Sequence, residues 1–262
     1  MRIVDILTGP PTFSFEFFPP KDEEGAEVLR QTINDLSPLS PSYVSVTYGA
    51  VGSTRRRTVD LVKKIKHESG IEAMAHLTCV GASRDEIDEV LAELKASGVH
   101  NILALRGDPP KDSNGFVPAA DGFAHANELI AFIRSRYDFC LGGACYPEKH
   151  PEAQSMEEDL ANLKRKVDDG AQFLVTQLFF DNDRFFRFRD QAVAQGIHVP
   201  IIAGILPILS LPQLSFASKN GVTLPAVLQA QLDAAKDDPA EIRRIGVEHA
   251  WQQSQNLLEQ GV

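Results

Sequence analysis

The sequence predicts an α/β protein, a (β/α)8 TIM barrel. Short apolar segments recur roughly every 30 residues, a spacing typical of β/α units. The segments between them place apolar residues at helical spacing. Continuous apolar strands that alternate with amphipathic helices are typical of a parallel sheet covered by helices. Most of the strands also end in a polar or charged residue, which is where a barrel places its chemistry.

The predicted strands are the apolar runs at 12–17, 43–47, 73–77, 101–105, 140–146, 173–177 and 200–205. In a closed barrel the carboxyl ends of all strands meet at one rim. The polar residues at these ends are Glu16, Thr47, His76, Arg106 with Asp108, Tyr146 and Gln177. We therefore expect these side chains to converge on one active site.

Caps and breakers delimit the predicted helices. Ser83, with Glu86 three residues later, is a capping-box pattern, and Gly170 and Gly196 follow two helices where a left-handed residue is expected. The helices are expected at 23–36, after 53–54, from 83 to near 98, and at 124–136, 155–169, 183–195, 212–218, 225–235 and 239–260.

The even spacing, with no Gly/Ser-rich or Pro-rich linker, predicts one domain over 1–262. An eight-stranded barrel needs one more strand, and too few residues follow Gln260 to supply it. The expectation is thus a barrel domain whose eighth strand and last helix are missing at the C-terminal end.

Composition narrows the class of protein. A net charge of -10 argues against nucleic acid as the main partner, because phosphate binding favours a basic surface. No apolar run approaches the roughly 18 residues of a membrane span, and the first residues lack the apolar core of a signal peptide. The three cysteines are expected to be buried, reduced thiols of a cytoplasmic protein. No metal site is predicted.

Glu16 is the first candidate for chemistry. It is flanked by Phe15 and Phe17, and a carboxylate in poor solvent has a raised pKa that suits a general acid. The alternative is a strand-end glutamate that faces water.

The loop after the fourth strand offers Arg106, Gly107 and Asp108. Glycine allows close approach to a planar or phosphorylated ligand, with opposite charges beside it. The alternative is a turn held by a surface ion pair. After the fifth strand, Tyr146 and His150 offer two rings for ligand stacking.

The predicted helix 155–169 carries a polar arc of Asp159, Asn162, Arg165 and Lys166, which suits a pyrophosphate or is simply solvated. No Gly-x-Gly-x-x-Gly, Walker, His-Glu-x-x-His or Gly-x-Ser-x-Gly pattern is present, so a nucleotide is not expected to bind in the Rossmann or P-loop manner.

Seven segments, taken in order, resemble bacterial methylenetetrahydrofolate reductases. They are 13–20, 44–50, 76–79, 105–108, 146–152, 163–168 and 204–207. The resemblance implies a flavoprotein barrel that passes a hydride from NAD(P)H to FAD and then to 5,10-methylenetetrahydrofolate, giving 5-methyltetrahydrofolate by ping-pong kinetics. It also implies a cytoplasmic homo-oligomer.

The resemblance assigns roles residue by residue. Glu16 is similar to the general acid that opens the methylene bridge, and Asp108 to the carboxylate between flavin and folate. The implied FAD contacts are Thr47, His76, Arg106, Gly107, Asp108, His125, Ala126, Tyr146, His150, Asp159, Asn162, Arg165 and Lys166. The implied folate contacts are Glu16, Thr47, Gln177, Gln213 and Phe216, with Gln213 shared with the nicotinamide nucleotide.

The chain departs from the family pattern in three places. His125-Ala126 stands where the family usually has Tyr-Ala, a residue is missing around 210–217 near Phe216, and the closing Phe-Tyr-Thr-Leu-Asn-Arg strand is absent. Two alternatives follow: a flavin-independent reductase of the same family, or a folate- and flavin-binding homologue with impaired catalysis. The preference for NADH or NADPH is open.

Overall fold

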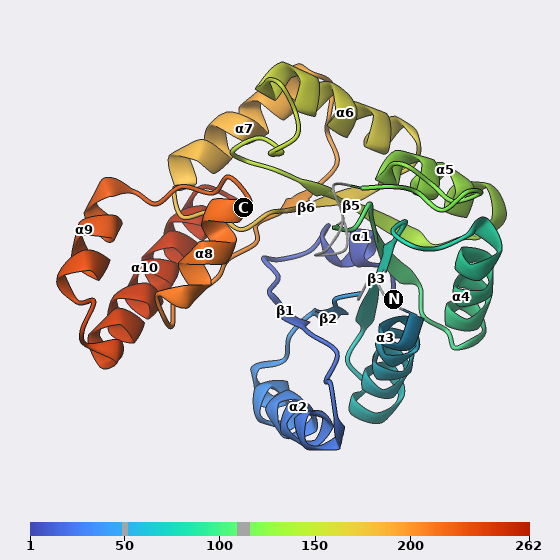
Figure 1. Ribbon diagram of the computed structural model, residues 1–262, viewed down its shortest axis with the longest axis horizontal. Helices are drawn as coiled ribbons and strands as arrows, with labels where there is room; N and C mark the ends of the chain where they lie inside the picture. The colour runs from blue at the N-terminus through green and yellow to red at the C-terminus, as the bar shows by residue number, and fades with distance from the viewer. Residues whose placement is uncertain (49–51, 109–115) are drawn as a thin grey trace. The chain divides into compact units, whose positions relative to one another are not determined.

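The computed structural model describes residues 1–48, 52–108 and 116–262, without the side chains of 52–55 and 216. The chain divides into two compact units (Figure 1). The first comprises Met1–Gly143 and Lys166–Gln172, and the second comprises Ala144–Arg165 and Phe173–Val262.

The strands form one seven-stranded sheet whose order follows the sequence from β1 to β7. Their bounds are β1 Ser14–Phe17, β2 Tyr43–Val46, β3 Ala73–Thr78, β4 Asn101–Leu105, β5 Cys140–Cys145, β6 Phe173–Thr176 and β7 Ile201–Ile202. The pairings of β1 with β2, β2 with β3, β3 with β4, β4 with β5 and β6 with β7 are parallel. The predicted α/β class and parallel sheet are confirmed, and the strand order is that of a β/α barrel.

The predicted helices are present, and their ends differ from the expected ones by at most two residues. They are α2 Glu23–Leu36, α3 Gly52–Lys64, α4 Arg84–Ala96, α5 Ala126–Arg136, α6 Met156–Asp168, α7 Asn182–Ala194, α8 Pro212–Lys219, α9 Ala226–Ala234 and α10 Pro239–Glu259. The capping box of α4 is confirmed, because Ser83 Oγ accepts from Glu86 N at 3.1 Å and Glu86 Oε2 accepts from Ser83 N at 2.8 Å. The three cysteines are buried and unbridged, as expected.

The core of the first unit lies on one face of its strands. Val44 and Val46 of β2, Ala75 and Leu77 of β3 and Ile102 of β4 alternate onto this face and are buried. They pack with apolar residues of α3, α4 and α5, which Figure 1 shows along the same side of the strands. The intervening residues of each strand therefore point to the opposite face.

A short helix that the sequence did not predict closes the amino-terminal edge of the first unit. This helix, α1 Ile3–Ile6, has too few residues to show an apolar period. Ile3 N donates to Asn101 Oδ1 at 2.8 Å, and Asn101 Nδ2 donates to Met1 O at 2.9 Å. Because Asn101 begins β4, these bonds tie the first residues to the edge opposite the strand ends that carry the candidate site residues.

In the second unit, strand β7 is shorter than predicted. The run at 200–205 forms only the two-residue strand Ile201–Ile202. Gly204 N donates to the Thr176 side-chain hydroxyl at 2.9 Å, so the ladder of backbone bonds with β6 has ended there. A Cβ at position 204 would lie 2.7 Å from Thr176 O, which makes glycine the residue that allows this approach.

The rest of the second unit is helical. Figure 1 shows α8, α9 and α10 side by side, and Ile208, Leu228, Leu232 and Ile242 form their buried core. Gly246 brings α10 against the backbone of Ile208, because a Cβ there would lie 1.9 Å from Ile208 O.

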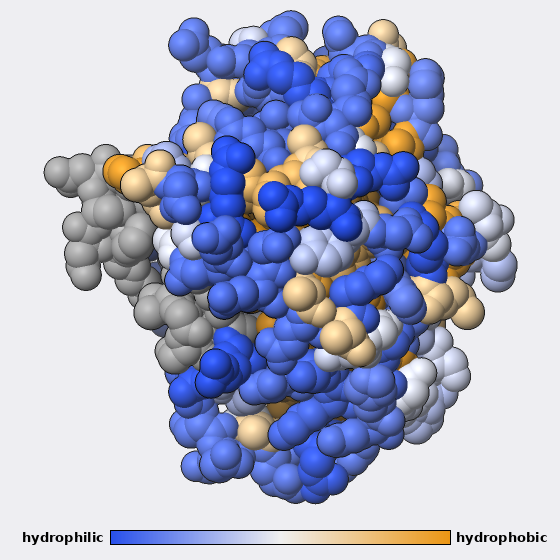
Figure 2. All heavy atoms as spheres, turned by 90° about the vertical axis from the view of Figure 1, so that its right-hand side faces the viewer, coloured by the Kyte–Doolittle hydropathy of each residue, from blue (hydrophilic) through white to orange (hydrophobic). Residues whose placement is uncertain are grey.

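Hydrophilic residues predominate on the face of the molecule seen in Figure 2, with hydrophobic residues scattered among them. Among the described residues, no helix has the length and apolar content needed to cross a membrane.

Gly246→Ala should destabilise the protein by about 2 kcal/mol or more, because the added methyl group meets backbone atoms that cannot rotate away. Urea unfolding followed by circular dichroism measures this. Gly25→Ala in α2 is the matched control, since its Cβ would meet only the Asp22 side chain and Pro20 at 3.2 Å and beyond. Equal stability of the two variants would contradict the close packing of α10.

Candidate active site at the carboxyl ends of the strands

A polar layer lies on the face of β1, β2 and β3 that the helices do not cover. Glu16 pairs with Ser45 across β1 and β2, and Ser45 pairs with Met74 of β3, two residues before His76. Ser45 Oγ and His76 Nε2 each lie 3.5 Å from Glu16 Oε2. The structure therefore brings together two of the predicted residues, Glu16 and His76, with a serine between them.

His76 is held as a neutral imidazole. The residue is 6% exposed, and burial lowers its pKa to about 4. Its Nε2 atom has no hydrogen-bond partner among the described residues, and the 3.5 Å contact with Glu16 is longer than a good hydrogen bond. A neutral ring can donate or accept at Nε2, so His76 offers the site a polar atom without a charge.

Glu16 has a raised pKa, in the predicted direction. Loss of water around the carboxylate raises its pKa, and the Ser45 hydroxyl opposes the shift. The side chain is 49% exposed, so the carboxyl remains open to a ligand.

The predicted cause, loss of water around the carboxylate, is confirmed, but the side chains nearest to it differ from those expected. Phe15 and Phe17 pack against the core on the helix-covered face, because neighbouring residues of a strand point to opposite faces. The side chains that lie beside the Glu16 carboxylate come instead from β2 and β3.

The loop after β4 is shaped by Gly107. Its φ is +85°, and a Cβ there would lie 2.7 Å from Val80 Cγ1 and 3.0 Å from Thr78 Cβ. Val80 N donates to Arg106 O at 3.1 Å, which holds the loop against the end of β3. Any larger residue would push this loop away from the polar layer.

A contact with an aromatic ring accounts for the position of the Arg106 side chain without an ion pair to Asp108. The Arg106 guanidinium lies over the Phe116 ring, 5.0 Å from its centroid, in a cation–π contact. Asp108 is exposed three residues beyond the end of β4. Since β1 to β4 are parallel, Glu16 and Asp108 lie at the same edge of the sheet.

Other predicted residues of the first unit have described positions. Thr47 follows β2, where its N–H donates to Phe17 O at 2.9 Å and its carbonyl accepts from Thr58 Oγ1 at 2.9 Å. Exposed His125 and buried Ala126 begin α5, and Glu128 Oε2 accepts from His125 N at 3.3 Å.

In the second unit, the loop after β5 pairs two predicted rings. Tyr146 and His150 meet edge to face with centroids 4.7 Å apart. His150 N donates to Asp159 Oδ2 at 2.8 Å, so this carboxylate of α6 fixes the loop. Asn162 is partly buried and Arg165 exposed on the same helix, while Lys166, partly buried, belongs to the first unit.

Sequence reasoning missed the group that anchors this loop. The Glu148 side chain is 5% exposed and accepts from Thr223 Oγ1 at 2.6 Å, Thr223 N at 3.1 Å and Arg184 Nη1 at 3.1 Å. Its partners lie 36 and 75 residues along the chain, so no local pattern indicates them. Ser45 was also missed, although its place two residues before Thr47 on one strand could have indicated a shared face.

The predicted folate contacts of the second unit are partly engaged with backbone. Gln177 Oε1 accepts from Leu178 N at 2.8 Å, and Gln213 Oε1 accepts from Leu209 N at 2.6 Å and Ser210 N at 3.1 Å. Their amide nitrogens are the groups they offer to a ligand. The Phe216 side chain lies outside the described residues.

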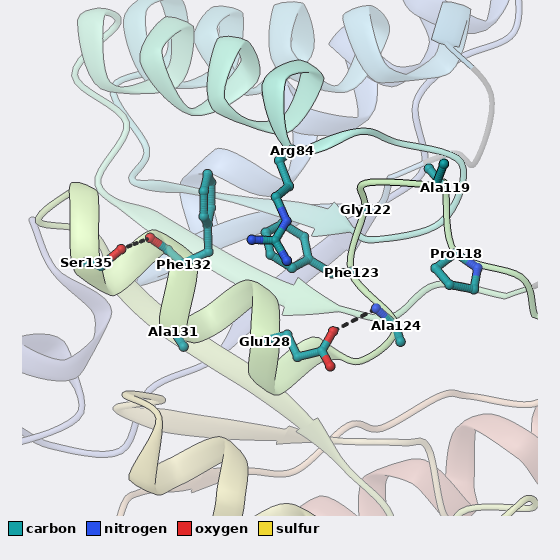
Figure 3. A pocket seen from close by; sticks show the side chains of 11 residues that line it. Arg84, Pro118, Ala119, Gly122, Phe123, Ala124, Glu128, Ala131, Phe132 and Ser135 are labelled. Carbon is teal, nitrogen blue, oxygen red and sulfur yellow. Dashed lines mark hydrogen bonds between the residues drawn. The ribbon is translucent and has the colours of Figure 1, made fainter.

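A hollow in the first unit is separate from these residues. It has a volume of about 710 Å³ and lies between the loop at 118–124 and helix α5, beneath Arg84 (Figure 3). Arg84 stacks over Phe123 and donates to Asp121 O, and Glu128 accepts from Ala124 N, so its charged groups are already engaged. None of the predicted site residues lines it. Among the described residues, no group of three or more His, Cys, Asp or Glu could hold a metal ion.

Comparison with known proteins gives the family. The family model described as "Methylenetetrahydrofolate reductase" matches residues 2–262. This chain belongs to the methylenetetrahydrofolate reductase family. It is 41% identical over 257 residues to the 5,10-methylenetetrahydrofolate reductase of Pectobacterium carotovorum, covering 98% of this chain and 84% of that protein. Reduction of methylenetetrahydrofolate is therefore the reaction of this chain.

Further relatives are also named as methylenetetrahydrofolate reductases. The 5,10-methylenetetrahydrofolate reductase of Escherichia coli is 41% identical and covers 95% of this chain and 82% of its own length. Methylenetetrahydrofolate reductase (NADH) 1 of Arabidopsis thaliana is 37% identical, with 100% of this chain and 47% of that protein covered.

A solved structure shares the fold. It is described as an uncharacterized protein from Clostridium thermocellum that binds two copies of 5-methyl-5,6,7,8-tetrahydrofolic acid. Its TM-score is 0.69 at 17% identity, covering 99% of this chain and 87% of that one.

The neutral state of His76 predicts a pH dependence of stability. The unfolded histidine has a pKa near 6.5 and the folded one about 4, so the unfolded chain binds the extra proton between these values. The free energy of unfolding should fall by about 3 kcal/mol as the pH drops from 6.5 to 4, from this group alone.

His76→Asn should flatten that acid slope, as measured by urea unfolding at several pH values. His198→Asn, at an exposed position, is the control and should keep the wild-type slope. A His76→Asn slope identical to that of the wild type would contradict the neutral, buried imidazole.

Proposed function

We propose that the chain works as a β/α barrel flavoenzyme that reduces 5,10-methylenetetrahydrofolate to 5-methyltetrahydrofolate, with FAD as resident cofactor and NAD(P)H as hydride donor. The observation that carries the proposal is Glu16, a half-exposed acid of raised pKa that faces a neutral, buried histidine. Such an acid keeps its proton closer to neutral pH than an ordinary glutamate does, and can give it to a substrate nitrogen.

The first unit has groups that fit a flat, polar heterocycle. Thr78 Oγ1 and His76 Nε2 are buried without partners among the described residues, at the end of β3. Gly107 lets the loop after β4 lie directly against Thr78 and Val80, because a Cβ at this position would clash with both side chains. Bound FAD would supply the two-electron relay between the two substrates. We propose Thr47, His76, Arg106, Gly107, Asp108, His125, Ala126 and Lys166 as its contacts from this unit.

The second unit fits the rest of such a cofactor. Tyr146 and His150 present a fixed pair of rings, and Asn162 and Arg165 lie three residues apart on α6. An exposed guanidinium with a neighbouring amide suits phosphate oxygens. We propose Tyr146, His150, Asp159, Asn162 and Arg165 as contacts to the flavin and to its ribityl, phosphate and adenosine parts.

The chain's own residues would supply acid and electrostatics. Glu16 donates its proton to the substrate nitrogen that leaves when the methylene bridge opens, which makes the bridging carbon electrophilic. Asp108, exposed at the same edge, places a negative charge where positive charge develops on the folate. We propose Thr47, Gln177, Gln213 and Phe216 as further folate contacts.

Two comparisons support the substrate and donor classes. The Clostridium thermocellum protein of similar fold binds 5-methyltetrahydrofolic acid according to its description, and the Arabidopsis relative is named as an NADH enzyme. The homo-oligomer and the cytoplasmic location stay predictions.

Glu16→Gln should keep NADH-driven flavin reduction and lose reduction of 5,10-methylenetetrahydrofolate by on the order of 100-fold or more, because the amide cannot donate the acid proton. Anaerobic stopped-flow measurement of the two half-reactions separates these steps.

Glu89→Gln, an exposed glutamate of α4, is the matched control and should change neither step. Equal loss of both half-reactions in Glu16→Gln would contradict the assignment of Glu16. Purified protein without a flavin absorption band, yet active with NADH, would favour the flavin-independent alternative.

A further inference from the structure

Two neighbouring groups lie close to one oxygen of the Glu16 carboxylate. Ser45 Oγ from β2 and His76 Nε2 from β3 are both 3.5 Å from Oε2, and within the described part of the chain neither residue makes a hydrogen bond to Oε1. We propose that Ser45 is a positioning residue that acts together with His76 to make Oε1 the oxygen that delivers the proton. This inference rests on the proposed role of Glu16 as the acid.

Both contacting groups are rigidly placed. Ser45 is 5% exposed and lies in β2, whose four residues are all buried, and His76 is equally enclosed in β3. Backbone pairing of Glu16 with Ser45 fixes the separation of the two side chains. Because strand pairing fixes the positions of Ser45 and His76, the Glu16 side chain adjusts to them. Strands β2 and β3 therefore orient the Glu16 carboxyl.

The direction of the hydrogen bond selects the oxygen. The Ser45 hydroxyl donates to Glu16 Oε2, which makes Oε2 the accepting oxygen. His76 Nε2 makes no hydrogen bond among the described residues, but it lies 3.5 Å from the same oxygen. The acid proton of neutral Glu16 therefore resides on Oε1.

No charge among the described residues competes with this pair of contacts. The groups that face Glu16 are Ser45 and His76, with the buried phenol of Tyr43 one layer below on β2. The pKa of Tyr43 is raised by burial and further by the negative charge of Glu16. Lysine and arginine side chains make no ion pair with Glu16 in the described part of the chain.

Ser45 therefore affects the pKa of Glu16 as well as the orientation of its carboxyl. Its hydroxyl stabilises the carboxylate and lowers the Glu16 pKa, against the larger effect of desolvation. Without the hydroxyl the acid holds its proton to higher pH and loses one of its two orienting contacts.

The test compares Ser45→Ala with Ser45→Thr, which keeps the hydroxyl, and with Ser135→Ala at an exposed position of α5 as control. The first readout is the titration of the Glu16 carboxyl by carbon-13 NMR of glutamate-labelled protein, with the resonance assigned by its loss in Glu16→Gln. The second is the pH dependence of both half-reactions of the flavin-loaded enzyme.

In Ser45→Ala we expect the Glu16 titration to move to higher pH. We expect the folate half-reaction to slow on the order of 10-fold, with its alkaline limb also at higher pH, while the NADH half-reaction is unchanged. Ser45→Thr should retain most of the wild-type behaviour.

An unchanged Glu16 titration in Ser45→Ala would overturn the proposal. Equal slowing of both half-reactions, unrescued by Ser45→Thr, would also overturn it in favour of a purely structural serine. Failure of the proposed function would look different, because Glu16→Gln would then reduce folate normally even if Ser45→Ala shifted the titration.

Discussion

The candidate site depends on the strict alternation of side chains along three short parallel strands. In β2 and β3 the residues Val44, Val46, Ala75 and Leu77 turn to the helices and are buried there. The residues between them turn to the other face, and this places Ser45 and His76 beside Glu16. A shift of register by one residue would move the acid and its partners into the apolar core, so the packing of the helices also fixes the chemistry.

Burial determines the charge state of this polar layer. An imidazole with almost no exposed surface resists protonation, and a carboxyl beside it that has lost part of its water resists ionisation. Both groups are therefore biased toward their neutral forms, which avoids a buried ion pair and its desolvation cost. The same bias leaves Glu16 with a proton to give, so the electrostatics of the fold and the proposed chemistry have one cause.

Most of the helices and strands could be predicted from the sequence because the signals that define them are local. Apolar periods, the capping box at Ser83 and the glycines that end α6 and α7 depend on neighbouring residues, and the structure has these features. The same apolar periodicity predicted the strand ends near Glu16, His76 and Asp108. Periodicity cannot assign chemical roles to these residues, so their expected roles came from the resemblance of the motifs.

The missed features depend on contacts distant in sequence or on the face of a strand. The carboxylate of Glu148 is satisfied by Arg184 and Thr223, and β7 ends where Gly204 turns to the Thr176 hydroxyl. Phe15 and Phe17 adjoin Glu16 in sequence but pack against the core, whereas across the sheet the neighbours of its carboxylate are Ser45 and His76.

The most direct measurement is the infrared difference spectrum between wild type and Glu16→Gln, recorded as the pH is raised through the ordinary glutamic acid pKa of about 4.3. A protonated carboxylic acid gives a carbonyl stretch that a carboxylate lacks. The account predicts that the carbonyl band of Glu16 disappears with a midpoint above the ordinary pKa. A midpoint at or below the ordinary pKa would contradict it.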